Sequence, residues 1–415
     1  MSGQWRYWWM VWVGLSSLAM AEIVPVWNLE GETMGTLWHV TLVKPEGEIL
    51  PSEVQKEIEE TLREIDTRMS TWKEYSELSR INATEKIDEE ILLSSELALV
   101  LRAALEVAQK SGGAYDITVG PLVNLWKFGP DSEKVTEERL PNDKEIQNAQ
   151  KNVGYAALRL AVDEDGTGKL KREKPGLYID LSSIAKGYGV DRVAEVLEKF
   201  GITSYMVEVG GEVRTSGKNV QNQPWRIGIE TPVPGISSLY GVVELEDASL
   251  ATSGDYRNFR QEGKKRLSHI LDPRTGRPVE HSLVSVSVQA DNCMLADAWA
   301  TALMVLGPEE GQNLAKKENI SALFLIQKGN QIENVAVHFP WKSFQKEKTS
   351  DYALWMQWLL PVLFFLFFFV AVGMSQLLGR RKMMCSCKAA KVMEKERNRL
   401  IQIQKMSDDE KVHFK

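Results

Sequence analysis

Cysteine is scarce in this sequence, with 3 among 415 residues. Cys293 is the single cysteine of the central part of the chain, whereas Cys385 and Cys387 form a C-x-C pair near its end. An intramolecular disulfide is therefore excluded for the central part. Because a metal site normally needs about four ligands, we interpret Cys385 and Cys387 as ordinary thiols. A metal site and a lipid attachment are the alternatives.

Basic tracts are also missing from the central region, and the whole chain carries a formal net charge of −7. Domains that bind nucleic acid present clustered Lys and Arg side chains to the phosphate backbone. Nucleic acid is therefore not expected as a partner of this protein.

The long apolar runs of the sequence lie toward its two ends. Near the start, one Arg precedes an apolar run of about a dozen residues, and Ala19-Met20-Ala21 is an A-x-A cleavage signature typical of a secretory signal. We expect residues 1–21 to be a signal peptide, with an uncleaved N-terminal anchor as the alternative. No Cys follows the signature, which excludes a lipoprotein anchor.

The second apolar run covers residues 352–378, with two Trp residues near its start. Its length is sufficient to cross a bilayer, and paired Trp residues are typical of the membrane interface. The basic sequence RRK follows at 380–382. The positive-inside rule therefore predicts a transmembrane helix at 352–378, a cytoplasmic tail at 379–415 and an exported domain at 22–345.

Within the exported domain, strand-like and helix-like segments alternate without a regular βαβ rhythm, which favours an α+β fold with mixed or antiparallel sheets and packed helices. Period-2 patterns predict strands, and apolar residues at helical spacing predict helices. The expected strands are 27–43 with a break at 34–36, 178–181, 205–209, 225–229 and 283–290. The expected helices are 51–69, 94–110, part of 130–153, 185–200 and 294–306, and a hairpin is expected after residue 256.

The stretch 283–307 carries the most informative polar residues. Asp291 or Asn292 can cap the apolar helix, in which Asp297 and Thr301 stand four residues apart on one face. A buried carboxylate is costly unless it is paired or bound to a cation. This helix alone favours a structural interpretation, in which Asp297 caps a neighbouring group and Thr301 bonds to its own helix. A pair of oxygen ligands for Mg²⁺ is the alternative.

A second candidate is the segment IDLSSIAKG, which leads through small residues into a helix. Small residues at a helix N-terminus let backbone N–H groups approach a phosphate, and Lys186 adds a positive charge. Many turns between a strand and a helix look alike, so this signal is weak by itself.

Taken together, eight motifs resemble the FAD:protein FMN transferase family, formerly labelled a thiamine-biosynthesis lipoprotein family. In chain order they are MGT, STW…SELSRIN, GAYDITVGPLVNLW, IDLSSIAKGYGVD, VEVGGEV, ATSGDY, HILDPRTGRP and ADAWATAL. The resemblance covers roughly residues 25–340. Mild departures occur at Trp72, at Ser182-Ser183 and at Glu212, and none of them removes a chemically necessary group.

The resemblance implies a Mg²⁺-dependent transfer of FMN from FAD to a Thr or Ser hydroxyl of a target protein, forming a phosphoester and releasing AMP. It further implies that Mg²⁺ is held by Asp297, Thr301 and a backbone oxygen near Ala185. His269 is the expected general base, because an imidazole titrates near neutral pH. The positions that the family uses around the flavin nucleotide match Met34, Trp72, Ala114, Tyr115, Asp116, Asp180, Ser183, Lys186 and Leu271.

Other polar and aromatic residues of the motifs are interpreted as structural. We expect Asp272 to support a turn, Gly210-Gly211 to meet a backbone requirement, and Trp126 and Phe128 to lie in the core. The role of Asp255 and Tyr256 stays open. Of the 5 histidines only His269 lies in a dense motif; the others are expected to be structural or solvated, namely His39, His281, His338 and His413.

The resemblance also implies a setting: a bacterial inner-membrane protein whose catalytic domain is periplasmic and modifies subunits of membrane redox complexes of the Nqr or Rnf type. The chain has no acceptor-like S/T-G-A-S/T stretch of its own, which favours modification of another protein. Two alternatives remain, an FAD pyrophosphatase that gives FMN and AMP, and a non-catalytic flavin-binding assembly factor. The C-terminal helix with its two cysteines faintly resembles a small membrane maturation factor of a sodium-pumping NADH:quinone reductase.

Overall fold

The computed structural model describes residues 25–343, except 46, 85–86, 131–138, 236–237, 257–258 and 263–264. The described residues belong to the first of two units of the chain, Met1–Phe344, and the second is Gln345–Lys415. The predicted signal peptide, transmembrane helix and basic tail lie outside the described residues. Among the helices of the described part, none combines the length and the apolar character needed to cross a membrane.

An eight-stranded antiparallel sheet forms the centre of the described unit, with strand order β1-β2-β6-β7-β10-β15-β16-β17. The strands are β1 (Val26–Thr33), β2 (Thr36–Val43), β6 (Tyr205–Val209), β7 (Glu212–Ser216), β10 (Ser249–Gly254), β15 (Leu283–Ala290), β16 (Ser321–Lys328) and β17 (Gln331–Val337). The order joins segments from both ends of the described chain, so the sheet forms only when these distant segments meet. The β7–β10 pairing covers just Arg214–Ser249 and Val213–Leu250, and the two strands diverge beyond it.

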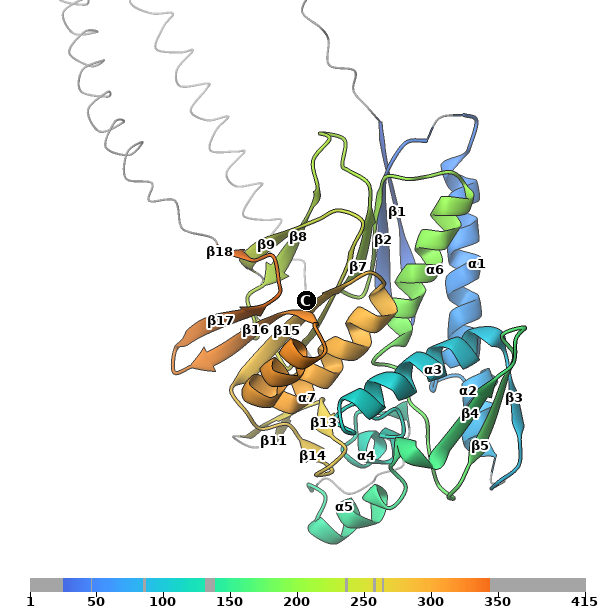
Figure 1. Ribbon diagram of the computed structural model, residues 1–415, viewed down its shortest axis with the longest axis vertical. Coiled ribbons are helices and arrows are strands. Elements are labelled where there is room, and N and C mark those ends of the chain that lie inside the picture. Colours follow the sequence, from blue (N-terminus) through green and yellow to red (C-terminus); the bar gives the residue numbers. More distant parts are fainter. Residues whose placement is uncertain are drawn as a thin grey trace, which may run out of the picture. The chain divides into compact units, whose positions relative to one another are not determined.

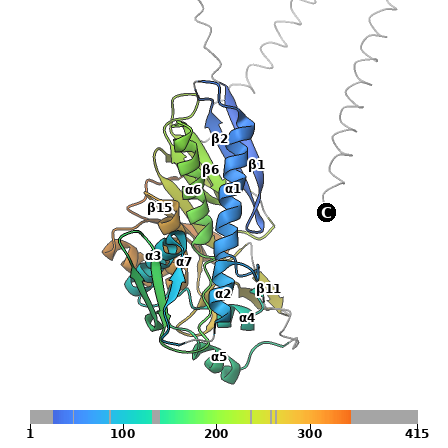
Figure 2. The ribbon, with the colours of Figure 1, turned by 90° about the vertical axis from the view of Figure 1, so that its right-hand side faces the viewer.

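Three helices cover one face of this sheet: α1 (Pro51–Met69), α6 (Ala185–Lys199) and α7 (Cys293–Lys317). Figures 1 and 2 show α1 and α6 side by side over β1, β2 and β6, while α7 runs along β15. The buried residues of α1 recur at helical spacing and face this layer, namely Val54, Ile58, Leu62, Ile65 and Met69. The main hydrophobic core therefore lies between the sheet and these helices.

A small sheet covers part of the other face, with strand order β18-β9-β8. It consists of β8 (Trp225–Glu230), β9 (Leu239–Leu245) and β18 (Lys342–Ser343). Ile227 and Val243 from the small sheet share a second hydrophobic cluster with Leu250 and Leu323 from the large one. This packing places β8 opposite the point at which β7 and β10 diverge.

The remaining elements surround the lower end of the unit in Figure 1. They are α2 (Glu77–Ala83), α3 (Ser95–Lys110), α4 (Gly120–Leu125), α5 (Asp143–Gln150), η2 (Tyr155–Ala157), the sheet of β3 (Ile91–Leu93), β5 (Gly168–Arg172) and β4 (Leu158–Val162), and the hairpins β11 (Phe259–Glu262) with β12 (Lys265–Ser268) and β13 (Leu271–Asp272) with β14 (Arg277–Pro278). A third cluster joins Leu122 and Trp126 to Leu267 and Leu271. It fixes the segment between β12 and β13, which carries His269.

The α+β expectation is confirmed for the described residues, and most predicted elements are present. The strand predicted at 178–181 is wrong. Tyr178 forms only an isolated parallel bridge with Val119, because Asp180 turns the chain away. Its N–H donates to Ile117 O at 2.7 Å, and its carboxylate accepts from the Ser182 N–H at 2.8 Å. In the polar stretch 130–153, the helix is limited to Asp143–Gln150, and 131–138 lies outside the described residues.

The helix α7 begins where the sequence predicts and continues beyond the predicted end at 306. Asn292, rather than Asp291, caps it by accepting from the Leu295 N–H at 2.8 Å. The helix kinks at Gly307, whose φ of 77° is left-handed. Pro308 has no N–H for the Met304 carbonyl, and His281 Nε2 lies 2.9 Å from that oxygen instead. This contact lets the chain pass the kink without leaving the carbonyl unpaired.

Candidate active site

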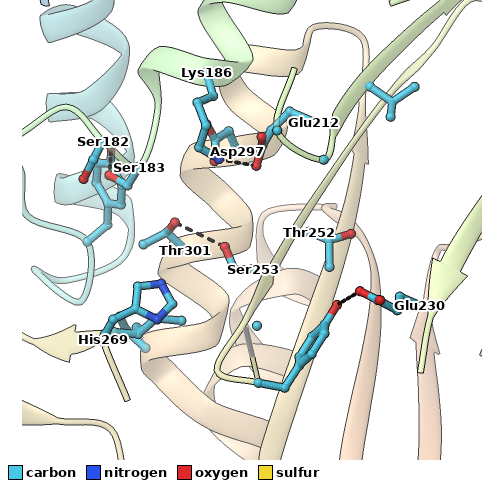
Figure 3. A pocket seen from close by; sticks show the side chains of 18 of the residues that line it. Ser182, Ser183, Lys186, Glu212, Glu230, Thr252, Ser253, His269, Asp297 and Thr301 are labelled. Carbon is cyan, nitrogen blue, oxygen red and sulfur yellow. Dashed lines mark hydrogen bonds and ion pairs between the residues drawn. The ribbon is translucent and has the colours of Figure 1, made fainter. Parts of the chain in front are cut away.

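A cavity of about 680 Å³ lies where β7 and β10 diverge, bounded by β8, α6, α7 and the 269–273 segment. Most of the predicted site residues line it: Ala114, Tyr115, Asp116, Asp180, Ser183, Lys186, His269, Leu271, Asp297 and Thr301. These residues come from segments far apart in the chain, and Figure 3 shows several of them facing the same space. The fold therefore gathers the residues that the motifs single out.

Three predicted site residues do not line this cavity. Met34 has a φ of 48° in the β1–β2 turn and packs against α6, with its Cε 3.0 Å from the place a Cβ on Gly189 would occupy. The Trp72 side chain is 69% exposed on the loop after α1. Ala185 is the buried first residue of α6, directly before Lys186. A role for Ala185 through its backbone oxygen thus stays a prediction.

The charged centre of the cavity is an ion pair between α6 and β7. Lys186 Nζ lies 2.6 Å from Glu212 Oε1, and the Glu212 side chain is almost fully buried. Burial raises the pKa of Glu212 to about 7 against the attraction of Lys186. For Lys186 burial disfavours the charge, but attraction to Glu212 and Asp297 outweighs it and raises the pKa above its ordinary value. The ammonium is therefore positioned by carboxylates and stays charged near neutral pH.

The face of α7 beside this ion pair presents two oxygen-bearing side chains to the cavity. Asp297 is 4% exposed, and its Oδ2 accepts from the Gly187 N–H at 3.1 Å. Burial raises the pKa of Asp297, opposed by Lys186 and by that hydrogen bond. Thr301 lies one helical turn further on, with Oγ1 3.3 Å from Ser253 Oγ (Figure 3). A carboxylate and a hydroxyl thus point into the same space.

This arrangement fits a Mg²⁺ ion that is only partly bound by protein. Mg²⁺ usually takes one or two carboxylates and completes its shell with substrate phosphates and water. Asp297 and Thr301 supply such hard oxygen atoms, and the trio Lys186, Glu212 and Asp297 carries net −1 when all three are ionised. Within the described residues, no group of three or more His, Cys, Asp or Glu side chains is arranged to hold a metal. The geometry therefore suits a cation shared with phosphate oxygens.

Another wall of the cavity is polar and is built largely by local turns. Both oxygens of the buried Asp116 carboxylate are engaged: Oδ1 accepts from the Thr118 N–H at 2.8 Å and its hydroxyl at 2.7 Å, and Oδ2 accepts from the Tyr155 N–H at 2.9 Å. The Ser183 hydroxyl donates to the Tyr115 hydroxyl at 3.1 Å. Burial raises the pKa of Tyr115. Tyr115 is therefore uncharged near neutral pH, and the Asp116 carboxylate is held in place by its hydrogen bonds.

His269 follows β12 and lines the cavity from the side of the β13 hairpin. Its ring makes an edge contact with Phe128, with centroids 6.4 Å apart and planes at 71°. The side chain is half-buried, and Figure 3 shows the ring directed into the cavity. An imidazole in this position can exchange a proton with a group bound beside the metal pair.

Some residues that were not predicted as site residues also line the cavity. Glu212 was noted only as a departure, yet it is the partner of Lys186. No local pattern marked it, because its strand reads EVRTS and is mostly polar, and its partner Lys186 lies 26 residues away in the sequence. Tyr256 also lines the cavity and donates to Glu230 Oε2 at 3.1 Å. Asp255, by contrast, pairs with Arg266 at 3.1 Å.

The structural interpretations agree with the observed contacts. Asp272 is bound to Arg274 at 2.9 Å. Gly210 and Gly211 have φ of 60° and 105°, which glycine adopts readily. Trp126 lies in the core and donates from Nε1 to Gly276 O at 2.8 Å. These residues position the cavity walls.

Comparison with known proteins places this site in context. The model of the ApbE family matches residues 34–324. A Haemophilus influenzae protein named FAD:protein FMN transferase is 39% identical over 320 residues, which is 77% of this chain and 91% of that protein. A Vibrio cholerae protein of the same name is 41% identical over 300 residues, or 72% of this chain and 87% of that protein.

Solved structures of flavin transferases are also similar to this chain in fold. The flavin transferase ApbE from Vibrio cholerae superposes with a TM-score of 0.68 at 39% identity, covering 75% of this chain and 97% of that one. The apo Pseudomonas stutzeri flavinyl transferase ApbE gives a TM-score of 0.67 at 34% identity, with 75% and 95% covered. The resemblance drawn from eight sequence motifs, and the transferase class that it implied, are thereby confirmed. This chain belongs to the ApbE family.

Proposed function

We propose that this protein transfers FMN from FAD to a Thr or Ser hydroxyl of a target membrane redox protein and releases AMP. The observation that carries the proposal is the meeting of Lys186, Asp297, Thr301 and His269 around one cavity. Its volume of about 680 Å³ lies within the range of pockets that enclose a small organic ligand. The proteins named above as FAD:protein FMN transferases support FAD as the substrate.

In the proposed reaction the acceptor hydroxyl oxygen attacks the phosphorus of the FMN half of FAD. A new phosphorus–oxygen bond forms to the acceptor, and the bond to the bridging oxygen of the pyrophosphate breaks, so that AMP leaves with that oxygen. The His269 imidazole accepts the hydroxyl proton during the attack, which is the role of a positioned general base. Atoms and charge are balanced once the proton passes from His269 to solvent or to AMP.

Charge neutralisation is assigned to the groups on α6 and α7. Asp297 and Thr301 would hold Mg²⁺ together with a backbone oxygen at Ala185, and the bound ion would polarise the pyrophosphate oxygens. The Lys186 ammonium, held by Glu212 at 2.6 Å, faces the same region and stabilises negative charge that develops on the leaving phosphate. Tyr115 and Ser183 form the wall that orients the substrate.

The test is direct modification of a candidate acceptor. The full-length chain is co-expressed with the exported domain of a flavin-carrying subunit of an Nqr- or Rnf-type complex, and the intact subunit is weighed by mass spectrometry. We expect a mass increase equal to one FMN phosphoester on a single Thr or Ser. An unmodified subunit, together with accumulation of free FMN and AMP, would favour FAD hydrolysis. Unmodified subunit with intact FAD would favour a non-catalytic assembly factor.

We also propose that the catalytic domain is periplasmic and is anchored in the bacterial inner membrane by residues 352–378. The support is the signal-like start of the sequence and the basic residues directly after the apolar run. A phosphatase that is active only in the periplasm, fused after Lys415, should be inactive. The same reporter inserted after residue 345 should be active. Activity of the fusion at Lys415 would reverse the proposed topology.

A further inference from the structure

A buried carboxylate outside the cavity ties together the two helices that carry the proposed Mg²⁺ site. Asp191 lies on α6, is 7% exposed, and points at the first turn of α7. Its Oδ1 accepts from the Cys293 N–H at 2.9 Å, and its Oδ2 accepts from the Met294 N–H at 2.9 Å. The first N–H groups of a helix have no partner within the helix and attract negative charge. Asp191 therefore caps α7 from a neighbouring helix.

A third contact links this carboxylate to the large sheet. Arg214 on β7 places Nη1 2.8 Å from Asp191 Oδ1. The same strand begins with Glu212, which pairs with Lys186 on α6. Two ion pairs thus connect α6 to β7, one on each side of the point where α7 meets α6. We call Asp191, Arg214 and the N–H groups of Cys293 and Met294 the Asp191 clamp.

The clamp lies beside a close contact between α6 and α7. A Cβ on Gly187 would stand 2.3 Å from the Cys293 carbonyl oxygen and 2.9 Å from the Asp297 Cβ. The Gly187 N–H also donates to Asp297 Oδ2 at 3.1 Å. Asp297 is one turn into α7 from Cys293, and Lys186 is just over one turn before Asp191. Any shift of the start of α7 relative to α6 therefore changes the distance between Asp297 and the α6 N-terminus.

We propose that Asp191 is a positioning residue for the Mg²⁺-dependent binding of FAD, because it sets α7 against α6 and so holds Asp297 beside the first turn of α6. This inference rests on the proposed function. Residues that orient a metal ligand without touching the metal typically contribute a factor of about 10–100 in metal affinity. Asp191 has this relation to Asp297 through the N-terminal turn of α7.

The test compares two caps of the same helix end. Asn292 caps α7 from the chain segment just before it, accepting from the Leu295 N–H at 2.8 Å, and among the described residues its side chain makes no hydrogen bond to α6. Asn292→Ala therefore removes a cap alone, whereas Asp191→Ala removes a cap together with the tie between helices. Asp191→Asn keeps the shape and one acceptor oxygen but loses the charge. Asp191→Asn is the variant to measure if Asp191→Ala does not fold.

The readout is FAD binding rather than turnover. The full-length protein and each variant are dialysed to equilibrium against FAD over a series of MgCl₂ concentrations, with EDTA as the metal-free point. We expect Asp191→Ala to raise the Mg²⁺ concentration for half-maximal FAD retention about tenfold, and Asp191→Asn to raise it less. Metal-free FAD binding should change less than twofold in all variants. Asn292→Ala should match the wild type.

The outcomes separate this inference from the function beneath it. If wild-type FAD binding does not respond to Mg²⁺, the metal part of the proposed function fails, and the inference fails with it. If the wild type responds but Asp191→Ala and Asn292→Ala give equal midpoints, the clamp is an ordinary helix cap and only the inference is overturned. An equal loss of FAD binding with and without Mg²⁺ in Asp191→Ala would overturn it as well.

Discussion

Two buried carboxylates line the same cavity, and they differ in what surrounds them. Asp116 accepts three hydrogen bonds from residues of its own wall, at 2.7, 2.8 and 2.9 Å. Asp297 accepts one hydrogen bond, from Gly187, among the described residues, and its other close influences are charges. Both side chains are under 10% exposed. Similar burial therefore goes with different partners: the Asp116 oxygens are occupied by local hydrogen bonds, whereas Asp297 keeps hydrogen-bonding capacity that a cation could use.

The largest expected effect comes from Asp297→Ala. Loss of the carboxylate removes the charged ligand of the proposed metal pair, so transfer should fall below detection and the Mg²⁺-dependent part of FAD binding should disappear. Thr301→Ala, which removes a neutral ligand, should be milder. Circular dichroism should show both variants folded, because removing Asp297 also removes the cost of burying its charge. Near-normal Mg²⁺-dependent activity in Asp297→Ala would make α7 purely structural.

A smaller loss is expected for His269→Ala. A positioned base typically contributes about 10²–10⁴-fold to the rate, so turnover should drop by this factor while FAD affinity stays within a few-fold of wild type. Activity should recover partly as pH rises, because the acceptor hydroxyl then ionises more readily. Asp297→Ala should show no such recovery. Lost FAD binding without rescue by pH would identify His269 as a binding contact and not as the base.

The opposite pattern is expected at Asp116. Asp116→Ala leaves three donors without their acceptor, and a buried unsatisfied group costs about 1–3 kcal/mol. The free energy of unfolding should fall by about 2–4 kcal/mol, measured by urea denaturation, with an unchanged Mg²⁺ midpoint for FAD binding. A shifted Mg²⁺ midpoint for FAD binding with unchanged stability would contradict this prediction. Asp116 would then contribute to Mg²⁺-dependent FAD binding, as proposed for Asp297.

The smallest effect is a dependence of stability on pH through Glu212. Burial raises its pKa from 4.5 to about 7. Between these values the unfolded chain has already lost the proton that the folded protein keeps, so the free energy of unfolding falls as pH rises through this window. Glu212→Gln should flatten this slope. The measurement is urea denaturation at several pH values between 4.5 and 7 with EDTA and without FAD. A slope that is steeper in Glu212→Gln would contradict the assignment.

Much of the fold follows from local patterns in the sequence. The helical spacing from Val54 to Met69 predicts α1 with its observed bounds, and the Val/Ser alternation predicts β15. The prediction of a strand at 178–181 is wrong because the Asp180 carboxylate accepts a hydrogen bond from the Ser182 N–H, which favours a turn. The period-2 pattern of a strand contains no information about such local hydrogen bonds. Helix α7 continues past residue 306. His281, which lies 23 residues before Met304, makes the hydrogen bond to the Met304 carbonyl that Pro308 cannot donate.

The site was predictable where a motif concentrates the chemistry and unpredictable where it depends on tertiary contacts. Asp297, Thr301 and His269 stand in dense motifs, and the fold brings them to one cavity. Glu212 gains its importance from Lys186, 26 residues away, and Asp191 gains its importance from an amide 102 residues away. Trp72 matches a family position, yet its side chain is 69% exposed outside the cavity lining.

In the proposed reaction, one cavity brings the Mg²⁺ ligands Asp297 and Thr301, which would activate the phosphate, together with the base His269, which serves an acceptor hydroxyl. The most direct test incubates the full-length protein with FAD, Mg²⁺ and an acceptor subunit, and counts AMP released against FMN bound covalently to the subunit. We expect near-equal amounts of the two, and neither product with Asp297→Ala. AMP released together with free FMN, and no modified subunit, would contradict it and identify a hydrolase.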